Sequence, residues 1–270
     1  MKRILFIFFI SNFLFLQGQE REPSIYTEII NSHLPKNNYS LKNGIPKEIT
    51  IIDTLNLYNN ETWIKKNKYT YLTKDKIQVT KYKNNELSAE EIIKIDKENR
   101  IIDYDGNIKY NDGKWFMTRI NYIYEKNKKT IEKINDFGEI YIRYSIEYDK
   151  FKNPAVIKFD IVGPNYERLE TADYDYKNGV FMILEFGYDG RLENETKGFI
   201  NTDYVISKNQ NNDITKMYWI TSDKKDNIFH EFDYEYDKKG NWIKKIRTII
   251  TPNEPKKIIS STYRKIIYKN

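Results

Sequence analysis

From residue 46 to the end of the chain, apolar and polar residues mostly alternate with a period of two. This alternation is typical of β-strands that bury one face against a core and expose the other face to water. We predict strands at residues 49–54, 62–72, 76–83, 92–96, 115–124, 130–135, 139–148, 155–160, 168–176, 180–186, 214–221, 228–236, 242–251 and 256–268. The pattern therefore predicts a mainly β protein.

One segment before this region has a helical period. Within residues 24–34, four apolar residues fall on one side of a helix: Ile25, Ile29, Ile30 and Leu34. Pro35 follows as a stop signal, so we predict a short helix that lies across the sheet or over one end of it. Residues 88–91 also resemble a helix cap, which leaves a second short helix there as an alternative to a strand.

A four-residue turn, Asp-Lys-x-x, recurs along the chain, with copies that begin at Asp96, Asp149, Asp223 and Asp237. An Asp at the first position can accept hydrogen bonds from backbone N–H groups ahead of it. Gly, Asn or Asp at the fourth position tolerates the left-handed conformation that closes a type I hairpin with a bulge. Lys152, at the fourth position of the second copy, suits that conformation poorly. The turn predicts hairpins and carries no chemistry.

Asp-Gly and Asn-Gly pairs at residues 105–106, 112–113, 178–179 and 189–190 mark further turns. Both central positions of a two-residue hairpin loop need positive φ, which these residues tolerate, so we predict two-residue hairpins there.

The turn at residues 237–240 allows the register of the last hairpin to be predicted. The expected partners are Tyr236 with Trp242, Asp233 with Lys245, Phe232 with Ile246 and Glu231 with Arg247. One face would then carry apolar pairs and the other would carry opposite charges, each pair contributing about 0.2–1 kcal/mol. The same argument for the hairpin at residues 178–179 places Tyr176 opposite Phe181 and Tyr174 opposite Ile183.

The chain divides into three parts by composition. Lys2 and Arg3 followed by an apolar run to Leu16 are typical of a secretory signal peptide, which we place at residues 1–18, with an uncleaved anchor as the alternative. Residues 19–45 hold the helix and a lead-in. Residues 46–270 form a single antiparallel β domain, with its best-marked hairpin at 228–251. The predicted fold is an antiparallel meander of stacked hairpins that forms a large curled sheet or open barrel with one short N-terminal helix.

Composition excludes several kinds of site and partner. The chain has no Cys, which rules out disulfides, thiolate metal sites and cysteine nucleophiles. Its 45 Lys and Arg residues are interspersed with 39 Asp and Glu residues, whereas a nucleic-acid-binding protein gathers its positive charge on one face. A transmembrane barrel would need an outward apolar band about 25 Å tall. Since most strands keep one face charged, we expect a soluble sheet that does not span the membrane after signal removal.

Candidate catalytic and metal sites are weak. The acidic ladder Glu231, Asp233, Glu235 and Asp237 could bind a metal or supply paired carboxylates for glycosidic cleavage, but the cations predicted opposite it favour surface ion pairing. Residues 103–107 lack the third ligand and the Glu of a calcium loop, so we assign them to a hairpin turn. His33 and His230 are the only histidines, and no Gly-x-Ser-x-Gly, phosphate loop or His-x-x-x-His is present. No catalytic residue, metal or cofactor is predicted.

Aromatic residues are the remaining lead. Tyr, Phe and Trp make up 15% of the chain, more than a core of this size needs. Tyr or Trp on an open sheet face can stack on sugars or anchor a partner protein. Our candidate binding residues are Tyr218, Trp219, Tyr236 and Trp242, although burial in the core is the alternative for each.

The C-terminal third resembles a known sequence type. Residues 232–242, Phe-Asp-Tyr-Glu-Tyr-Asp-Lys-Lys-Gly-Asn-Trp, and the final Tyr-Arg-Lys-Ile-Ile-Tyr at 263–268 resemble the tail of secreted Bacteroidetes proteins of unknown function. They are also similar to the YD repeats of Rhs and wall-associated proteins, with looser echoes at residues 148–153 and 188–191. The resemblance implies stacked β-hairpins without known catalytic residues. True YD arrays repeat far more regularly than this chain does.

These observations support three hypotheses. The first is an exported, non-catalytic binding or envelope-associated module, periplasmic or extracellular, whose partner is a protein, glycan or lipid of the cell envelope. The second is a carrier whose half-open barrel holds a lipid or lipoprotein chain beneath the helix. The third is a glycan-active hydrolase with paired carboxylates in an aromatic cleft.

Overall fold

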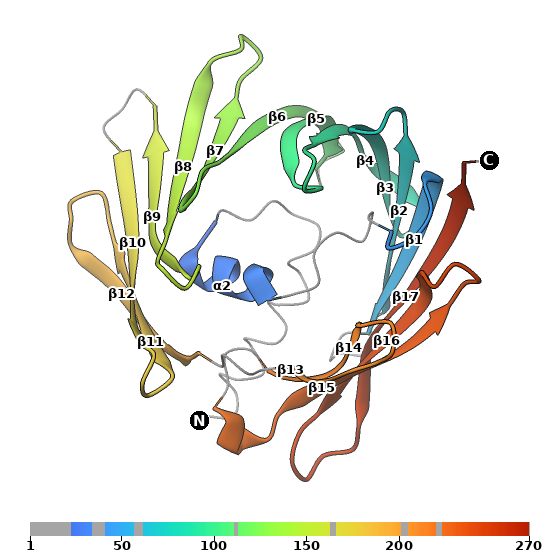
Figure 1. Ribbon diagram of the computed structural model, residues 1–270. Coiled ribbons are helices and arrows are strands. Elements are labelled where there is room, and N and C mark those ends of the chain that lie inside the picture. The colour runs from blue at the N-terminus through green and yellow to red at the C-terminus, as the bar shows by residue number, and fades with distance from the viewer. Residues whose placement is uncertain are drawn as a thin grey trace.

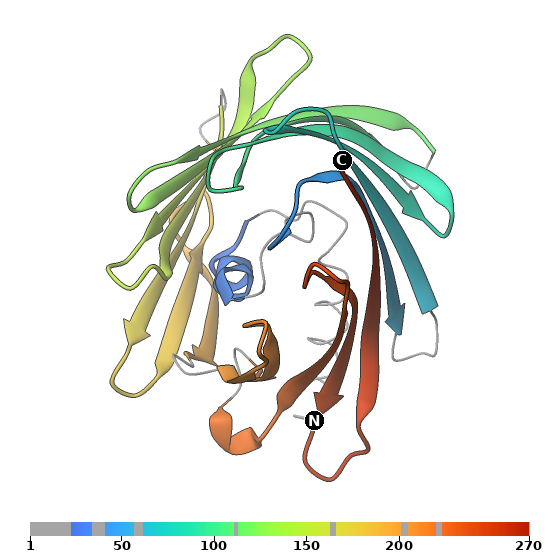
Figure 2. The same ribbon diagram turned by 45° about the vertical axis from the view of Figure 1, so that its right-hand side comes forward.

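The computed structural model describes residues 23–33, 41–56, 62–110, 113–162, 166–200, 205–219 and 223–269. The predicted signal peptide, Leu34 and Pro35 lie outside the described residues. Figure 1 shows a sheet that curls around one short helix, and Figure 2 shows the same arrangement turned by 45° about the vertical axis.

Among the described residues, seventeen strands form the sheet. They are β1 (Pro46–Asn56), β2 (Thr62–Tyr71), β3 (Lys76–Lys83), β4 (Glu86–Ile95), β5 (Ile101–Lys109), β6 (Trp115–Tyr124), β7 (Lys128–Ile134), β8 (Ile140–Tyr148), β9 (Pro154–Ile161), β10 (Tyr166–Asp175), β11 (Val180–Phe186), β12 (Leu192–Phe199), β13 (Val205–Lys208), β14 (Ile214–Tyr218), β15 (Phe229–Tyr236), β16 (Trp242–Ile250) and β17 (Lys257–Tyr268). The helix is α2 (Ile25–His33), and a short 3₁₀ helix, η2, covers Lys224–Asp226.

The sheet is an antiparallel meander in which successive strands pair from β1 to β12 and again from β13 to β17, and β17 also pairs with β1. The first and the last strand of the sheet therefore meet within one continuous surface (Figure 1). Among the described residues, no pairing joins β12 to β13, so the sheet stays open there. The predicted fold class, a curled antiparallel meander with one short N-terminal helix, is confirmed.

Three strands, β5, β12 and β13, were not predicted. Asp105 and Gly106, predicted as a turn, lie in the middle of β5 opposite β4 and β6. The Gly is needed for space, because a Cβ at Gly106 would lie 2.8 Å from Cγ of Glu91 on β4. Residues 88–91, the alternative helix, belong to strand β4.

Most hairpin turns share one form, a type I turn closed by a residue with positive φ. In the turn after β15, the N–H of Gly240 donates to the carbonyl of Asp237 at 3.0 Å, and φ of Gly240 is 78°. The Asp237 carboxylate accepts from the N–H of Lys239 at 2.9 Å, as predicted. Lys152 also adopts positive φ, at 68°, despite its side chain. In the Asp223 copy the left-handed residue is Asn227, one place later than predicted.

The turns at Asp-Gly and Asn-Gly pairs are longer than predicted. Gly190 donates to the carbonyl of Gly187, which gives the same bulged form instead of a two-residue loop. In the Asn178-Gly179 hairpin, Tyr174 faces Phe181, two residues away from the predicted register. Because the shift is even, both side chains keep the predicted face.

Tyrosines tie successive hairpins together. The hydroxyl of Tyr176, the residue after β10, donates to Asp149 in the turn between β8 and β9. Tyr236 donates to Asp213 beside the β13–β14 turn at 2.8 Å, and Tyr268 donates to Asp237. In the Tyr236-Asp237 dipeptide, the Tyr therefore closes the preceding hairpin and the Asp forms the next turn.

The helix α2 lies on the concave face of the sheet, against β9 and β10 (Figures 1 and 2). Ile25 and Ile29 are 0% and 3% exposed and belong to the core cluster. The helix start is fixed by the sheet, since Glu170 of β10 accepts the N–H of Ile25 at 2.8 Å. At the other side, Glu28 pairs with Lys129 at 3.2 Å. The predicted helix is confirmed, and it lies inside the curl against β9 and β10.

Candidate functional site

One β-bulge sets the faces of the last hairpin. Tyr236 faces Trp242 as predicted, but Glu235 faces Lys244, so Ile243 is an extra residue in β16. Beyond it the predicted register is wrong by one residue: Asp233 faces Ile246, Phe232 faces Arg247 and Glu231 faces Thr248. A one-residue shift moves every later side chain to the other face. Lys245 and Arg247 therefore lie on the concave face, opposite Tyr234 and Phe232, instead of opposite the acidic ladder.

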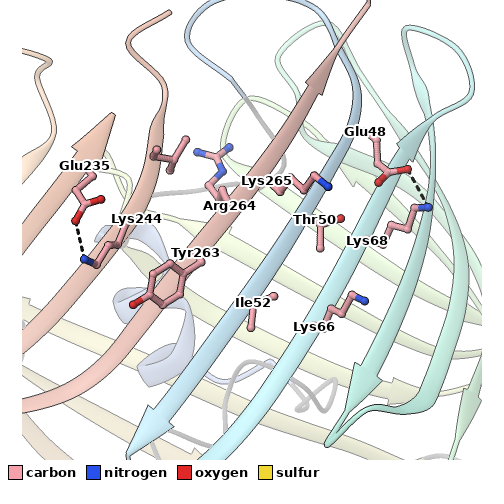
Figure 3. A pocket seen from close by; sticks show the side chains of 11 residues that line it. Glu48, Thr50, Ile52, Lys66, Lys68, Glu235, Lys244, Tyr263, Arg264 and Lys265 are labelled. Carbon is pink, nitrogen blue, oxygen red and sulfur yellow. Dashed lines mark hydrogen bonds and ion pairs between the residues drawn. The ribbon is translucent and has the colours of Figure 1, made fainter. Parts of the chain in front are cut away.

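A shallow groove of about 630 Å³ lies on the convex face, across β15, β16, β17, β1 and β2. Figure 3 shows its side chains on the face of the sheet turned away from α2. Tyr263 of β17, 46% exposed, lies on the groove floor between strands β16 and β1. Lys66 of β2 and Lys265 of β17 also line it.

Two ion pairs flank the groove, as Figure 3 shows. Lys244 lies 2.6 Å from Glu235 at one side, and Lys68 lies 2.9 Å from Glu48 at the other. The hydrogen bonds to these carboxylates, aided by their charge, raise the pKa of Lys244 and Lys68. The groove thus holds two acids, each already paired with a lysine.

The remaining lysines give the groove its charge. Among the residues that the structure describes, neither Lys66 nor Lys265 makes an ion pair with a carboxylate. Nζ of Lys66 lies 5.2 Å from the ring centroid of Tyr82, and Nζ of Lys244 lies 5.9 Å from that of Tyr263. Ammonium groups beside an exposed Tyr ring can hold anionic groups while the ring packs against an apolar or sugar face.

The sequence could show the polar face of each of these strands but not that the strands are neighbours. Lys66 and Lys68 alternate with inward residues on β2, as Tyr263 and Lys265 do on β17. They meet because β1 pairs with both β2 and β17, so the first and the last strand of the sheet lie side by side. No local signal specifies that pairing, and the groove residues were not predicted.

The four aromatic candidates are spread over both faces. Tyr218 lies opposite Phe229 on the neighbouring strand, and its ring centroid is 5.8 Å from Nζ of Lys224. Trp219 follows it and turns to the other face, with its ring 4.9 Å from that of His230. The hydroxyl of Tyr236 is held by Asp213 and by Asn209, the latter at 2.7 Å, which assigns it to the hairpin contacts.

Trp242, the fourth candidate, contacts cations of the concave side. Its ring centroid lies 4.0 Å from Cζ of Arg264 and 5.1 Å from Nζ of Lys245. Arg264 is 6% exposed, and burial lowers its pKa to about 10. Trp219 and Trp242 therefore share the concave face, whereas Tyr218 does not.

The acidic ladder makes surface ion pairs, but with partners other than the predicted ones. Glu231 pairs with Lys256 at 2.8 Å and with Lys216 at 3.7 Å, and Glu235 pairs with Lys244. Asp237 accepts bonds from its own turn. Within the described ranges, no group of three or more His, Asp or Glu side chains could hold a metal ion.

The two histidines lie far apart in the chain. Helix α2 ends at His33. His230 is 2% exposed, and Nη2 of Arg247 lies 3.0 Å from its Nε2. Burial, with the nearby guanidinium, lowers the pKa of His230 well below its ordinary value, so the ring is neutral and accepts from Arg247.

Comparisons with known proteins give a likeness in solved structures only. No protein-family model matches the chain, and no curated protein sequence matches it either. A porin-like protein from Bacteroides uniformis aligns over 82% of this chain and 98% of its own, with 10% identity and a TM-score of 0.32. A porin-like protein from Bacteroides vulgatus aligns over 84% and 99%, with 10% identity and a TM-score of 0.30. At these values no property of either protein carries over to this chain.

In the part of the chain that the structure describes, no helix is both long and apolar enough to cross a bilayer.

Proposed function

We propose that this protein is an exported, non-catalytic binding module of the cell envelope that holds an acidic glycan in the convex groove. The observation that carries the proposal is the exposed ring of Tyr263 set among lysines. A sugar ring can pack on the Tyr while its carboxylate or phosphate groups contact Lys66 and Lys265.

The groove suits binding better than hydrolysis. Retaining and inverting glycosidases both need two carboxyl groups that act on one bond. Glu48 and Glu235 line the groove, but the carboxylate of each is already paired with a lysine. The hydrolase hypothesis therefore gains no support from this site.

The carrier hypothesis also lacks its main requirement. It needs an open apolar space beneath the helix, whereas Ile25 and Ile29 of α2 are buried in the core cluster against the sheet. Tyr26 and Tyr148 pack against the same cluster.

The test is binding of polygalacturonate, an acidic polysaccharide, to the full protein, with dextran as the neutral control polymer. Tyr263→Ala and the double variant Lys66→Gln/Lys265→Gln should each weaken binding about tenfold or more. Lys245→Gln is the matched control, because Lys245 lies on the opposite face. Equal binding of dextran, or unchanged binding by both groove variants, would contradict the proposal.

A further inference from the structure

The concave face carries a group of basic side chains that the hairpin bulge turns inward. We call it the inner basic cluster, and it consists of Lys65, Lys81, Lys83, Lys245 and Arg247. Its members come from β2, β3 and β16, which are brought together by the pairing of β17 with β1.

Cross-strand pairing places several of these residues in one row. Lys245 faces Thr262, Thr262 faces Asp53, Asp53 faces Lys65, and Lys65 faces Lys83. Neighbouring strands lie about 4.8 Å apart, so Lys245 and Lys65 start on the order of 14 Å apart. Between them stand two shorter side chains, over which the longer lysines can lean.

The row has more positive than negative charge. Asp53, 7% exposed, accepts a hydrogen bond from the hydroxyl of Thr262 at 2.6 Å and interacts electrostatically with both flanking lysines. Among the described residues, neither Lys65 nor Lys245 makes an ion pair within 4.0 Å. Lys81 alone in the cluster is paired, with Glu91 at 2.5 Å.

Arg247 and Lys83 are backed by aromatic rings. The guanidinium of Arg247 is held by neutral His230 and lies 5.9 Å from the ring centroid of Trp219. Nζ of Lys83 lies 4.6 Å from the ring centroid of Trp63, and Trp63 faces Leu55 next to the Asp53 row. Contacts to His and Trp orient these cations without neutralising them.

The cluster is shielded yet within reach of solvent. Lys65, Lys245 and Arg247 are half-buried, and Lys83 is exposed. Burial lowers the pKa of Lys245 to about 8 and that of Arg247 to about 10, because a shielded environment disfavours the charged form of each side chain. A bound anion would stabilise the charged form of both side chains.

We infer that the inner basic cluster is a binding site for a small, multiply charged oxyanion of the phosphate class, held between Lys65 and Lys245 above Asp53 and Thr262. Arg247, two residues further along β16 and on the same face as Lys245, completes the site. This site lies on the face opposite the Tyr263 groove, and it stands whether or not the groove binds a glycan.

The test is calorimetric titration of the full protein with inorganic pyrophosphate at neutral pH. Lys65→Gln and Lys245→Gln should each lower the affinity by about 10- to 100-fold, the effect of losing one hydrogen bond to a charged group. Lys66→Gln and Lys244→Gln remove the neighbouring lysines on the other face and should change it by less than about twofold.

Charge-retaining variants separate binding from folding. Lys65→Arg and Lys245→Arg should keep most of the affinity, and circular dichroism should show the same β content for all variants. Absence of saturable binding at millimolar pyrophosphate would overturn the inference. An equal loss in the Lys244→Gln and Lys245→Gln proteins would overturn it as well.

Discussion

Lys244 and Lys245 are adjacent in the chain and act on opposite faces of the sheet. Lys244 pairs with Glu235 at 2.6 Å on the convex face, beside Tyr263. Lys245 lies opposite Thr262 on the concave face, in the row that contains Asp53. Adjacent residues of a strand always point to opposite faces, and the extra residue Ile243 decides which lysine takes which face, because it shifts β16 by one residue against β15.

Oxyanion affinity should fall as the pH rises through about 8. Burial lowers the pKa of Lys245 to about 8, so the side chain is protonated below that pH and loses its positive charge above it. The charged groups that act on it are Asp53 of β1, Arg264 of β17, Asp213, and Arg247 of its own strand.

Pyrophosphate titrations at pH 7 and pH 9 check this. The wild-type protein should lose affinity over the interval, and Lys245→Arg, which stays charged, should lose much less. Pyrophosphate changes its own charge between these pH values, but this change affects both proteins equally and drops out when their losses are compared. Parallel losses in the two proteins would show that Lys245 does not control binding.

Tyr268→Phe should lower the free energy of unfolding by about 1–2 kcal/mol. The hydroxyl donates to the Asp237 carboxylate and accepts from the Asn241 amide at 2.9 Å, and both partners belong to the last hairpin turn. Tyr263→Phe, on the same strand, removes an exposed hydroxyl and should cost less than about 0.5 kcal/mol. Urea unfolding of both variants measures the difference in the free energy of unfolding. Equal losses would refute the stabilising role given to the hydrogen bonds of the Tyr268 hydroxyl.

Glu170→Ala should destabilise the protein by about 1–3 kcal/mol, because the buried N–H of Ile25 at the helix start loses its acceptor. Glu170→Gln keeps an oxygen acceptor at the same place. Since burial raises the pKa of Glu170, a neutral side chain is tolerated there. Thermal unfolding should therefore rank wild type and Gln together, above Ala; a Gln variant as unstable as Ala would contradict the capping role.

Gly106→Ala should cost about 1–3 kcal/mol through overpacking. A Cβ there would meet Cγ of Glu91 at 2.8 Å and the carbonyl oxygen of Glu90 at 2.9 Å. Asn107→Ala, the exposed next residue, is the control and should be close to neutral. Equal stability of the two variants in denaturant would mean that β4 and β5 are less tightly packed than the structure indicates.

Much of the fold could be predicted from local sequence. Period-two alternation located most strands, and the Asp-Lys-x-x motif predicted the bulged type I turns with their Asp hydrogen bonds. The strand β12, Leu192–Phe199, was missed because its residues are mostly exposed, so no apolar alternation marks it. Gly106 was wrongly predicted to lie in a turn, because the sequence does not distinguish a Gly that leaves space for Glu91 from a Gly that forms a turn.

The candidate sites depend on features without a local signal. The bulge at Ile243 is a single extra residue, and neither its apolar side chain nor its neighbours reveal it. Because of the bulge, Lys245 and Arg247 lie on the concave face opposite Tyr234 and Phe232, and not opposite Asp233 and Glu231 as predicted. Both sites also need β17 beside β1, a pairing between residues about as far apart in sequence as the domain permits.

The most direct test of two opposed binding faces is a crossed comparison of neighbouring lysines. Lys65→Gln/Lys245→Gln and Lys66→Gln/Lys265→Gln are each titrated with pyrophosphate and with polygalacturonate. We predict that the first protein loses pyrophosphate binding alone and that the second loses polygalacturonate binding alone. Loss of both ligands in either protein, or of neither ligand in both, would contradict the assignment of separate sites to the two faces.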